Sequence, residues 1–215
     1  GKYITRKADA VVAVTQGYLD SLFINKKQKN IIFSNGFDIE DIKNLSRTKI
    51  DKDKVIFSCV GALYKGKRKI DPILKCLKEL DHEGKIDLKN IMIYYAGNSE
   101  EDILISINTY ELQPYFHSFG SITRKESLEL QLSSDFLLLP SWNDYYRQDI
   151  MPGKLLEYIM IGKPVISLIS GLEANSLVNK ITSELNLGFA YEEANEPKAY
   201  YDLKSYIQYA INEWE

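Results

Sequence analysis

Residues 149–166 read DIMPGKLLEYIMIGKPVI, and this stretch decides the fold. Pro152 suits the first turn of a helix, and the apolar positions that follow it share one helical face. Gly162 is a typical helix stop, and the apolar run after Pro164 has the length of a strand. A helix that follows a loop and leads into a buried strand indicates an α/β unit, and the N-terminus of such a helix favours phosphate.

The same alternation of apolar strands and amphipathic helices continues along the chain. The expected strands are Ala10–Val14, Ile31–Phe33, Val55–Val60, Ile91–Ala96, Phe116–Phe119, Asp135–Pro140 and Pro164–Leu168. The expected helices are Gln16–Phe23, Asp71–Leu80, Glu100–Tyr110, Arg124–Leu132, Pro152–Ile161, Leu172–Glu184 and Lys198–Trp214. Continuous apolar strands separated by helices predict an α/β fold, a Rossmann-like parallel sheet with helices on both faces.

The composition narrows the class of protein. The chain has 215 residues, of which 45% are hydrophobic, and a net charge of −3. That charge gives no reason to expect a nucleic-acid partner, and no apolar run reaches the roughly 18 residues of a membrane span. Cys59 and Cys76 lie in apolar segments, which predicts reduced core thiols and a cytoplasmic location. Because the chain begins at Gly1 without a Met, we expect a fragment.

The segment from about residue 35 to residue 54 interrupts the alternation of strands and helices. It opens with Asn35-Gly36, is rich in charge and ends in Asp51-Lys52-Asp53-Lys54. We interpret it as a linker with a short helix. Residues 1–50 are therefore expected to be the remnant of an N-terminal domain with the interdomain linker. Residues 51–215 are expected to be a Rossmann-like ligand-binding domain with a C-terminal helix.

A basic turn with two glycines follows the strand that ends at Val60. It contains Gly61, Gly66 and the cations Lys65, Lys67 and Arg68. Glycines directly after a parallel strand let a ligand approach the backbone, and the cations can neutralise a diphosphate. The spacing is not that of a Walker loop. A solvated basic turn is an equally good interpretation of this segment alone.

The helix after Pro152 carries Lys154 and Glu157 three positions apart. They can form an exposed ion pair worth a few tenths of a kcal/mol, and local sequence favours that interpretation slightly. Alternatively, Glu157 accepts hydrogen bonds from two ribose hydroxyls while Lys154 and the helix dipole hold phosphate. The aromatic-rich loop 141–148, with Arg147, follows a strand at the ligand-binding edge of the predicted sheet. A sugar-binding loop and a plain surface loop are both open interpretations.

Other patterns point away from metal sites. Asp51-Lys52-Asp53 is an Asp-x-Asp tripeptide, but it precedes a strand inside a lysine-rich linker, so we expect no metal there. His82 and His117 are isolated from each other and from both cysteines, so zinc-ligand spacing is absent. We therefore expect no metal and no resident cofactor.

The order of these segments resembles the C-terminal half of the GT-B glycosyltransferases, specifically the retaining family 4 or group 1 enzymes. The resemblance covers about residues 8–190. It rests on Ala8–Thr15, on Ile31–Asp38 with its Asn-Gly-x-Asp crossover, on Val60–Leu63 with Lys65–Lys69, on Phe119–Ile122, on Pro140-Ser141, and on the Pro-x-Lys-Leu-x-Glu-Tyr run at 152–158 with Gly162–Val165. In this order and spacing the matches are strong.

The resemblance implies a domain that binds a nucleoside-diphosphate sugar as substrate and transfers the sugar with retention and without a metal. The implied catalytic residues are Asp149, Lys67 and Arg68. The implied donor-binding residues are Gly61, Lys65, Gly120, Ser121, Ile122, Arg147, Gly153, Lys154 and Glu157. Two positions depart from the family pattern: Asp149 stands where the family has the first Glu of its Glu-x7-Glu motif, and Ala62 stands in its Gly-Arg-Leu turn.

The resemblance also implies that most of an N-terminal acceptor domain is absent. A glycan or lipid-linked acceptor would bind that half, and any membrane contact, at the inner face, would be made only through it. The chain alone should bind donor weakly and transfer little sugar. Two alternatives stay open: a nucleotide-sugar 2-epimerase, which needs acid–base groups in the cleft, and a non-catalytic nucleotide-sugar-binding module, which the departures at Asp149 and Ala62 would fit.

Overall fold

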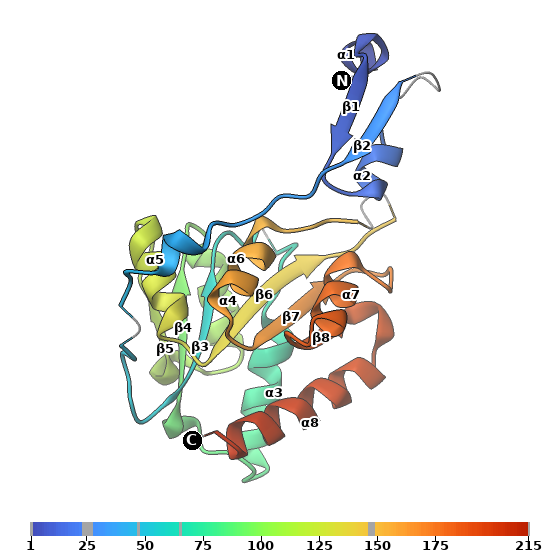
Figure 1. Cartoon of the computed structure of the whole chain (residues 1–215). Helices are drawn as coiled ribbons and strands as arrows, with labels where there is room; N and C mark the ends of the chain where they lie inside the picture. Colours follow the sequence, from blue (N-terminus) through green and yellow to red (C-terminus); the bar gives the residue numbers. More distant parts are fainter. Residues whose placement is uncertain (1, 23–27, 47, 65, 146–148, 215) are drawn as a thin grey trace.

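The computed structural model describes residues 2–22, 28–46, 48–64, 66–145 and 149–214. A small N-terminal unit, defined here as residues 2–22 and 28–34, projects from a larger sheet domain, residues 55–214 (Figure 1). The unit contains α1 (Lys2–Lys7), β1 (Ala10–Ala13), α2 (Gln16–Asp20) and β2 (Lys29–Ile32). Its strands β1 and β2 form a two-stranded parallel sheet. The expected division of the chain at residue 50 stays a prediction.

A six-stranded parallel sheet forms the centre of the sheet domain. Its strands are β3 (Val55–Val60), β4 (Ile91–Ala96), β5 (Phe116–Ser118), β6 (Phe136–Trp142), β7 (Val165–Ser170) and β8 (Gly188–Glu192). Their order across the sheet is β5-β4-β3-β6-β7-β8. The chain therefore builds one half of the sheet outward from β3 and then crosses over to β6, which confirms the predicted Rossmann-like fold class.

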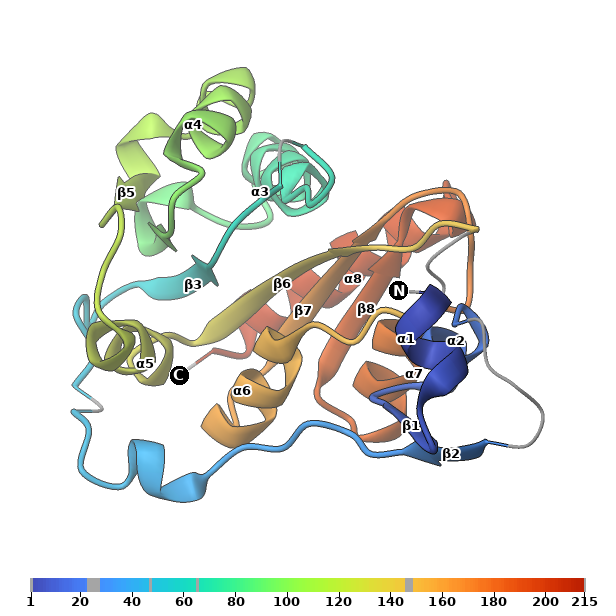
Figure 2. The ribbon, with the colours of Figure 1, turned by 90° about the horizontal axis from the view of Figure 1, so that it is seen from above.

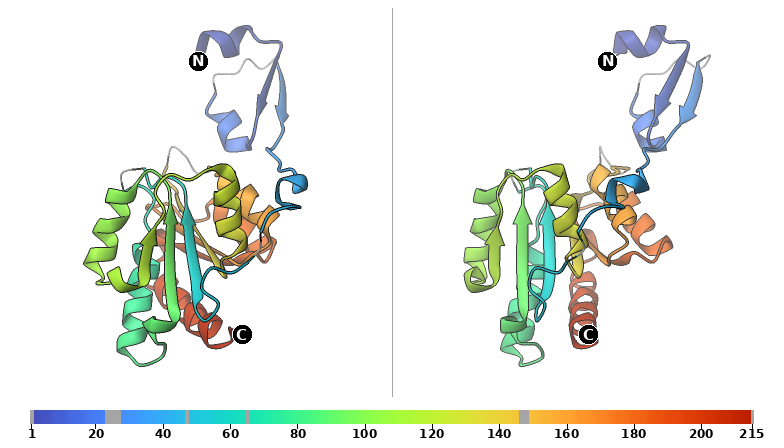
Figure 3. Two further views of the ribbon diagram at one scale, coloured as in Figure 1. Left: turned by 90° about the vertical axis from the view of Figure 1, so that its left-hand side faces the viewer. Right: turned by 60° about the vertical axis from the view of Figure 1, so that its left-hand side comes forward.

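Helices cover both faces of this sheet (Figures 2 and 3). The helices are α3 (Asp71–His82), α4 (Glu100–Thr109), α5 (Arg124–Leu132), α6 (Gly153–Ile161), α7 (Leu177–Glu184) and α8 (Lys198–Asn212). Short 3-10 turns are η1 (Ile39–Ile42), η2 (Leu88–Asn90), η3 (Gln113–Tyr115) and η4 (Glu193–Asn195). Helices α3, α4 and α8 pack on one face, and α5, α6 and α7 on the other. None of the helices among the described residues is both long and apolar enough to cross a membrane.

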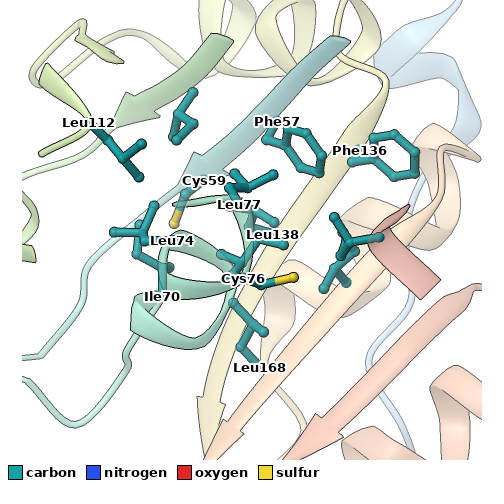
Figure 4. Close-up of a cluster of buried hydrophobic side chains, with 14 of the residues drawn as sticks. Phe57, Cys59, Ile70, Leu74, Cys76, Leu77, Leu112, Phe136, Leu138 and Leu168 are labelled. Carbon is teal, nitrogen blue, oxygen red and sulfur yellow. The ribbon is translucent and has the colours of Figure 1, made fainter. Parts of the chain in front are cut away.

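Alternating residues of the strands supply the two cores. In β3, Phe57 and Cys59 point to the side of α3, where Phe57 stacks on Phe136 with ring centroids 4.9 Å apart (Figure 4). Ile56 and Val60 point to the opposite side. This alternation follows from the two-residue period of a strand, and a strand buried on both faces has no polar side.

Several elements differ from the sequence-based expectations, most of all β8, α1 and α7. Strand β8 and helix α1 were not expected, and α7 begins at Leu177 rather than at Leu172. Ser176 caps α7, and its backbone N–H donates to the buried carboxylate of Glu192 over 2.8 Å. Residues before Ser176 therefore belong to a loop that Glu192 holds, a contact across 16 positions that the local apolar pattern does not encode.

Candidate functional site

The candidate site lies at the carboxyl ends of β3 and β6. These two neighbouring strands are where the order of the sheet reverses, and the crevice outside such a switch point is the usual ligand site of open α/β sheets. Gly61 follows β3 at this edge, and Asn143 follows β6.

The turn after β3 is fixed to the end of β4. Gly61 has φ of +123°, a conformation that side chains with a Cβ rarely adopt, and its N–H donates to Ala96 O over 2.8 Å. The hydroxyl of Tyr95 donates to Gly61 O over 2.8 Å. A Cβ on Gly97 would lie 2.3 Å from Gly61 O, so both glycines allow the two strand ends to approach. Hydrogen bonds from both sides therefore fix the backbone of Gly61 to the end of β4.

Arg68 reaches back over the end of the sheet. Its Nη1 donates to Ala62 O over 3.2 Å, and its guanidinium lies 4.5 Å from the ring centroid of Tyr64 and 5.1 Å from that of Trp142. Burial raises the pKa of the Cys59 thiol to about 12, and the charges of Arg68 and Lys154 oppose this rise. Both cations therefore lie close to the end of β3. Lys67 is exposed, and Lys65 lies outside the described residues.

Helix α6 begins at the same edge of the sheet without a side-chain cap. Pro152 occupies the N-cap position, and no side chain caps the first turn. The N–H groups of that turn, with the positive end of the helix dipole, suit an anion. Gly153 keeps the start of the helix open, since nothing lies within 4 Å of a Cβ built there. Gly162 ends the helix with φ of +72°, as the sequence predicts.

The carboxylate of Glu157 lies in the gap between α5 and α6, with 13% of its side chain exposed. Its Oε1 accepts from Lys154 Nζ at 2.5 Å and from Gln131 Nε2 at 2.7 Å. Its Oε2 accepts from Arg124 Nη1 at 3.2 Å, while Arg124 Nη2 lies 2.6 Å from Asp41 of the linker. The pair of Lys154 and Glu157 is therefore not the exposed ion pair that local sequence slightly favoured.

A glycine turn before α5 borders this gap. Gly120 has φ of +61°, and its carbonyl accepts from Gly97 N over 2.9 Å. Ser121 is exposed and Ile122 is half-buried. Thr123 caps α5 in a capping box with Glu126. The turn after β5 is thus held to the end of β4, as is Gly61.

The loop after β6 is only partly described, because Arg147 lies outside the described residues. Asn143 is buried, and its Nδ2 donates to Glu173 O over 2.8 Å. A Cβ on Gly171 would lie 2.1 Å from Asn143 O, so the loops after β6 and β7 touch. The indole Nε1 of Trp142 is buried without a partner among the described residues.

Asp149 contacts the N-terminal unit, which the local sequence did not predict. Its Oδ2 accepts from the N–H of Gly17 over 2.8 Å, and its carbonyl accepts from Thr15 Oγ1 over 3.2 Å. Both partners belong to the N-terminal unit. Asp149 therefore joins the N-terminal unit to the loop that precedes α6, and its catalytic role stays a prediction.

The site thus gathers several residues predicted from the sequence: Gly61, Arg68, Gly120, Ile122, Gly153, Lys154 and Glu157. Two residues that contact Glu157 were not predicted from the sequence, Gln131 and Arg124, which lie 26 and 33 positions from it along the chain. Arg124 lies two residues after the predicted turn 120–122, so its charge was a usable signal. Within the described residues, no group of three or more His, Cys, Asp and Glu side chains could hold a metal ion.

Comparison with known proteins adds the fold family. No protein-family model and no curated protein matches the chain. Solved structures of glycosyltransferases do match it. Sucrose-phosphate synthase from Thermosynechococcus elongatus is 15% identical over 99% of this chain and 51% of its own, with a TM-score of 0.66.

Two further glycosyltransferase structures are similar to this chain. WaaG, a glycosyltransferase involved in lipopolysaccharide biosynthesis, is 19% identical over 76% of this chain and 39% of its own, with a TM-score of 0.57. The pneumococcal O-GlcNAc transferase GtfA, crystallised with UDP and GlcNAc, is 13% identical over 96% of this chain and 39% of its own, with a TM-score of 0.58. The chain has the fold of GT-B glycosyltransferases. It spans about half or less of the length of these three structures.

Proposed function

We propose that this chain is the donor-binding half of a glycosyltransferase that moves a sugar from a nucleoside diphosphate to a glycan or lipid-linked acceptor with retention. The observation that carries the proposal is the sheltered carboxylate of Glu157, beside Lys154 on the uncapped first turns of α6, at the switch point of the sheet. A vicinal diol and a diphosphate need this combination of acceptor and cationic groups.

Each group has a distinct role in the proposal. Glu157 accepts hydrogen bonds from the ribose hydroxyls. The first-turn N–H groups of α6, with Lys154 and Arg68, bind the diphosphate that Gly61 allows to approach. The backbone of Gly120 to Ile122 frames the base. Because the departing diphosphate gains negative charge in the transition state, each preorganised donor of this kind lowers the barrier by roughly 3–4 kcal/mol in enzymes generally.

The comparison structures support the same class of ligand. GtfA was crystallised with UDP and GlcNAc, and a TarM structure holds UDP with a GlcNAc derivative. In the proposal, positive charge at the diphosphate comes from side chains and the helix terminus. Metal-independent transfer stays a prediction, which an assay with and without a chelator tests.

The histidines do not favour the epimerase alternative. His82 lies in the last turn of α3, and His117 lies in the edge strand β5, where its ring centroid is 4.5 Å from that of Phe119. Neither contacts the groups around Glu157. Epimerised product in an incubation with a nucleotide sugar would support the alternative.

Substitution of Glu157 tests the proposal directly. We expect Glu157→Ala to weaken binding of UDP or GDP by about ten- to a hundredfold, because hydrogen bonds to a charged group contribute roughly 1.5–3 kcal/mol. Calorimetry measures the affinity, and Glu101→Ala, at an exposed position of α4, is the matched control. An unchanged nucleotide affinity in Glu157→Ala would exclude the ribose role.

The acceptor half is needed for transfer, so residues 1–215 alone should transfer little sugar. Radiolabelled donor and a glycan acceptor, incubated with this chain, give the measurement. Efficient transfer by the chain alone would contradict the two-half arrangement, whereas transfer only by a longer parent chain would support it and exclude the non-catalytic module.

A further inference from the structure

Gln131 is a polar residue in a fully buried place. It lies on α5 with no exposed surface, yet its Nε2 donates over 2.7 Å to Glu157 Oε1 and over 2.9 Å to Ser127 O. It also lies 3.0 Å from Ser127 Oγ. The other end of the amide, Oε1, is buried without a hydrogen-bond partner among the described residues.

The chemistry of the neighbours fixes which way this amide points. A carboxylate and a backbone carbonyl only accept hydrogen bonds, so the reversed amide would set oxygen against oxygen at both contacts. The NH₂ group therefore faces Glu157. This arrangement leaves Gln131 Oε1 unsatisfied, and a buried unsatisfied acceptor costs stability. The amide therefore donates to Glu157 and Ser127 although its own Oε1 has no partner among the described residues.

The three donors around Glu157 differ in how freely they can move. The side chain of Arg124 is 63% exposed, and Lys154 has a long flexible side chain that is 25% exposed. The side chain of Gln131 is fully buried, so it has no room to turn away from Glu157. A carboxylate offers about four acceptor sites, of which three are occupied here. If Lys154 turns to a diphosphate and Arg124 keeps only its ion pair with Asp41, one site on each oxygen becomes free for a ribose hydroxyl while Gln131 still holds Oε1.

We propose that Gln131 is the positioning residue of the nucleotide site. It fixes the carboxylate of Glu157 in the orientation that accepts both ribose hydroxyls, and it acts only through Glu157. This inference rests on the proposed function, because it assigns a role in the same site.

The test measures how strongly the protein distinguishes ribose from dideoxyribose. NMR titration of the full chain gives the dissociation constants of UDP and GDP and of their 2′,3′-dideoxy forms. We expect the unmodified protein to prefer the ribose form of its nucleotide by roughly tenfold or more. Gln131→Met, which keeps the length and removes the donor, should reduce this preference to about two- or threefold and leave the affinity for the dideoxy form unchanged. The matched control is Gln113→Met, at an exposed position of η3.

A second variant, Gln131→Glu, places a charge beside Glu157. If Gln131 had only a structural role, the ribose preference of this variant would not depend on pH. Gln131→Glu sets two carboxyl groups side by side, and such a pair shares one proton at low pH. We expect the ribose preference of Gln131→Glu to be lost at pH 8 and to return toward pH 5.5. The preference of the unmodified protein should stay constant over that range.

The outcomes separate the two hypotheses. If the unmodified protein prefers ribose and both variants keep the full preference at every pH, the role of Gln131 is overturned and the proposed function stands. If the unmodified protein binds neither nucleotide, or does not distinguish ribose, the proposed function and the inference both fail. If Gln131→Met does not fold, the pH series of Gln131→Glu decides.

Discussion

At the scale of single residues, Arg68 is a half-buried cation with a hydrogen-bond donor available for an anion. Its guanidinium is half-buried against the rings of Tyr64 and Trp142, and its Nε makes no hydrogen bond within the described chain. Burial lowers the pKa of Arg68 because it disfavours the charged form. A guanidinium that has lost part of its water gains more from a diphosphate than an exposed ammonium does.

Substitution of Arg68 should therefore weaken nucleotide binding. We expect Arg68→Ala to reduce the affinity for UDP or GDP by about tenfold or more, since a charge-assisted hydrogen bond contributes roughly 1.5–3 kcal/mol. Calorimetry measures the affinity, and Lys67→Ala, at the exposed neighbouring cation, is the control. An equal loss in both variants would show that overall charge, rather than the Arg68 guanidinium, matters.

The buried thiols make stability depend on pH. Burial raises the pKa of Cys59 and of Cys76 to about 12, whereas an unfolded cysteine titrates near 8.5. Above that value the unfolded chain loses protons that the folded chain keeps. The free energy of unfolding should then fall as pH rises, by up to about 1.4 kcal/mol per pH unit for each thiol, and be unaffected by these thiols below pH 8.

Urea unfolding between pH 8 and pH 10 measures this slope. Cys59→Ala should make the slope shallower by about the share of one thiol, whatever its effect on stability at pH 7. A variant with the same slope as the unmodified protein would contradict the burial of the Cys59 thiol in the folded state.

At the scale of elements, α8 stabilises the half of the sheet domain that carries α3. Leu203 and Ile207 of α8 are fully buried in the core with Leu77 and Leu80 of α3. At the rim, Lys204 Nζ lies 2.8 Å from a carboxylate oxygen of Glu79 and 2.6 Å from one of Glu83, which lowers the pKa of both acids. Both carboxylates are partly exposed to solvent, which screens the ion pairs, so the apolar contacts supply most of the stability.

Removing a buried side chain of α8 should show how much its apolar contacts stabilise the domain. We expect Leu203→Ala to lower the free energy of unfolding by about 2–5 kcal/mol, because it leaves a cavity in a closed core. Tyr201→Ala, at an exposed position of the same helix, should change it by less than about 1 kcal/mol. Equal and small losses in both variants, measured by thermal unfolding, would mean that α8 does not pack as described.

At the scale of the whole molecule, the N-terminal unit leaves an apolar surface uncovered. Val12, Ile31, Ile32 and Phe33 are all exposed, and Phe33 has 74% of its surface free. Parallel strands are normally buried on both faces, and a sheet of two strands is marginal in water. The unit is thus short of the packing that such strands need, which fits the proposal that a further half completes it.

We expect this surface to make the chain self-associate. The double variant Ile31→Lys with Phe33→Glu should reduce the concentration-dependent association and leave unfolding of the sheet domain unchanged. Sedimentation velocity over a range of concentrations gives the measurement. Leu172→Lys, at an isolated exposed leucine, should not change it, and a variant that associates as strongly as the unmodified chain would locate the association elsewhere.

Local pattern predicted most of the sheet domain. The bounds of β3, β4 and α5 agree with the expected ranges, because an apolar run or a capping box marks each end. Strand β8 was missed because residues 188–192 contain only one aliphatic and two aromatic side chains beside Gly188 and Glu192. Its place depends on β7, where a Cβ on Gly188 would lie 2.3 Å from Val165 O.

The sequence by itself determined the Rossmann-like fold, the glycine turns and the helix that carries Lys154 and Glu157, because these follow from periodicity, caps and residue type within short windows. Only the tertiary structure decided which residues those side chains contact. The chain fold brings Gln131 and Arg124 onto Glu157, and Gly17 onto Asp149. Contacts between residues 26 to 132 positions apart depend on how the elements pack, and no local pattern of residues specifies them.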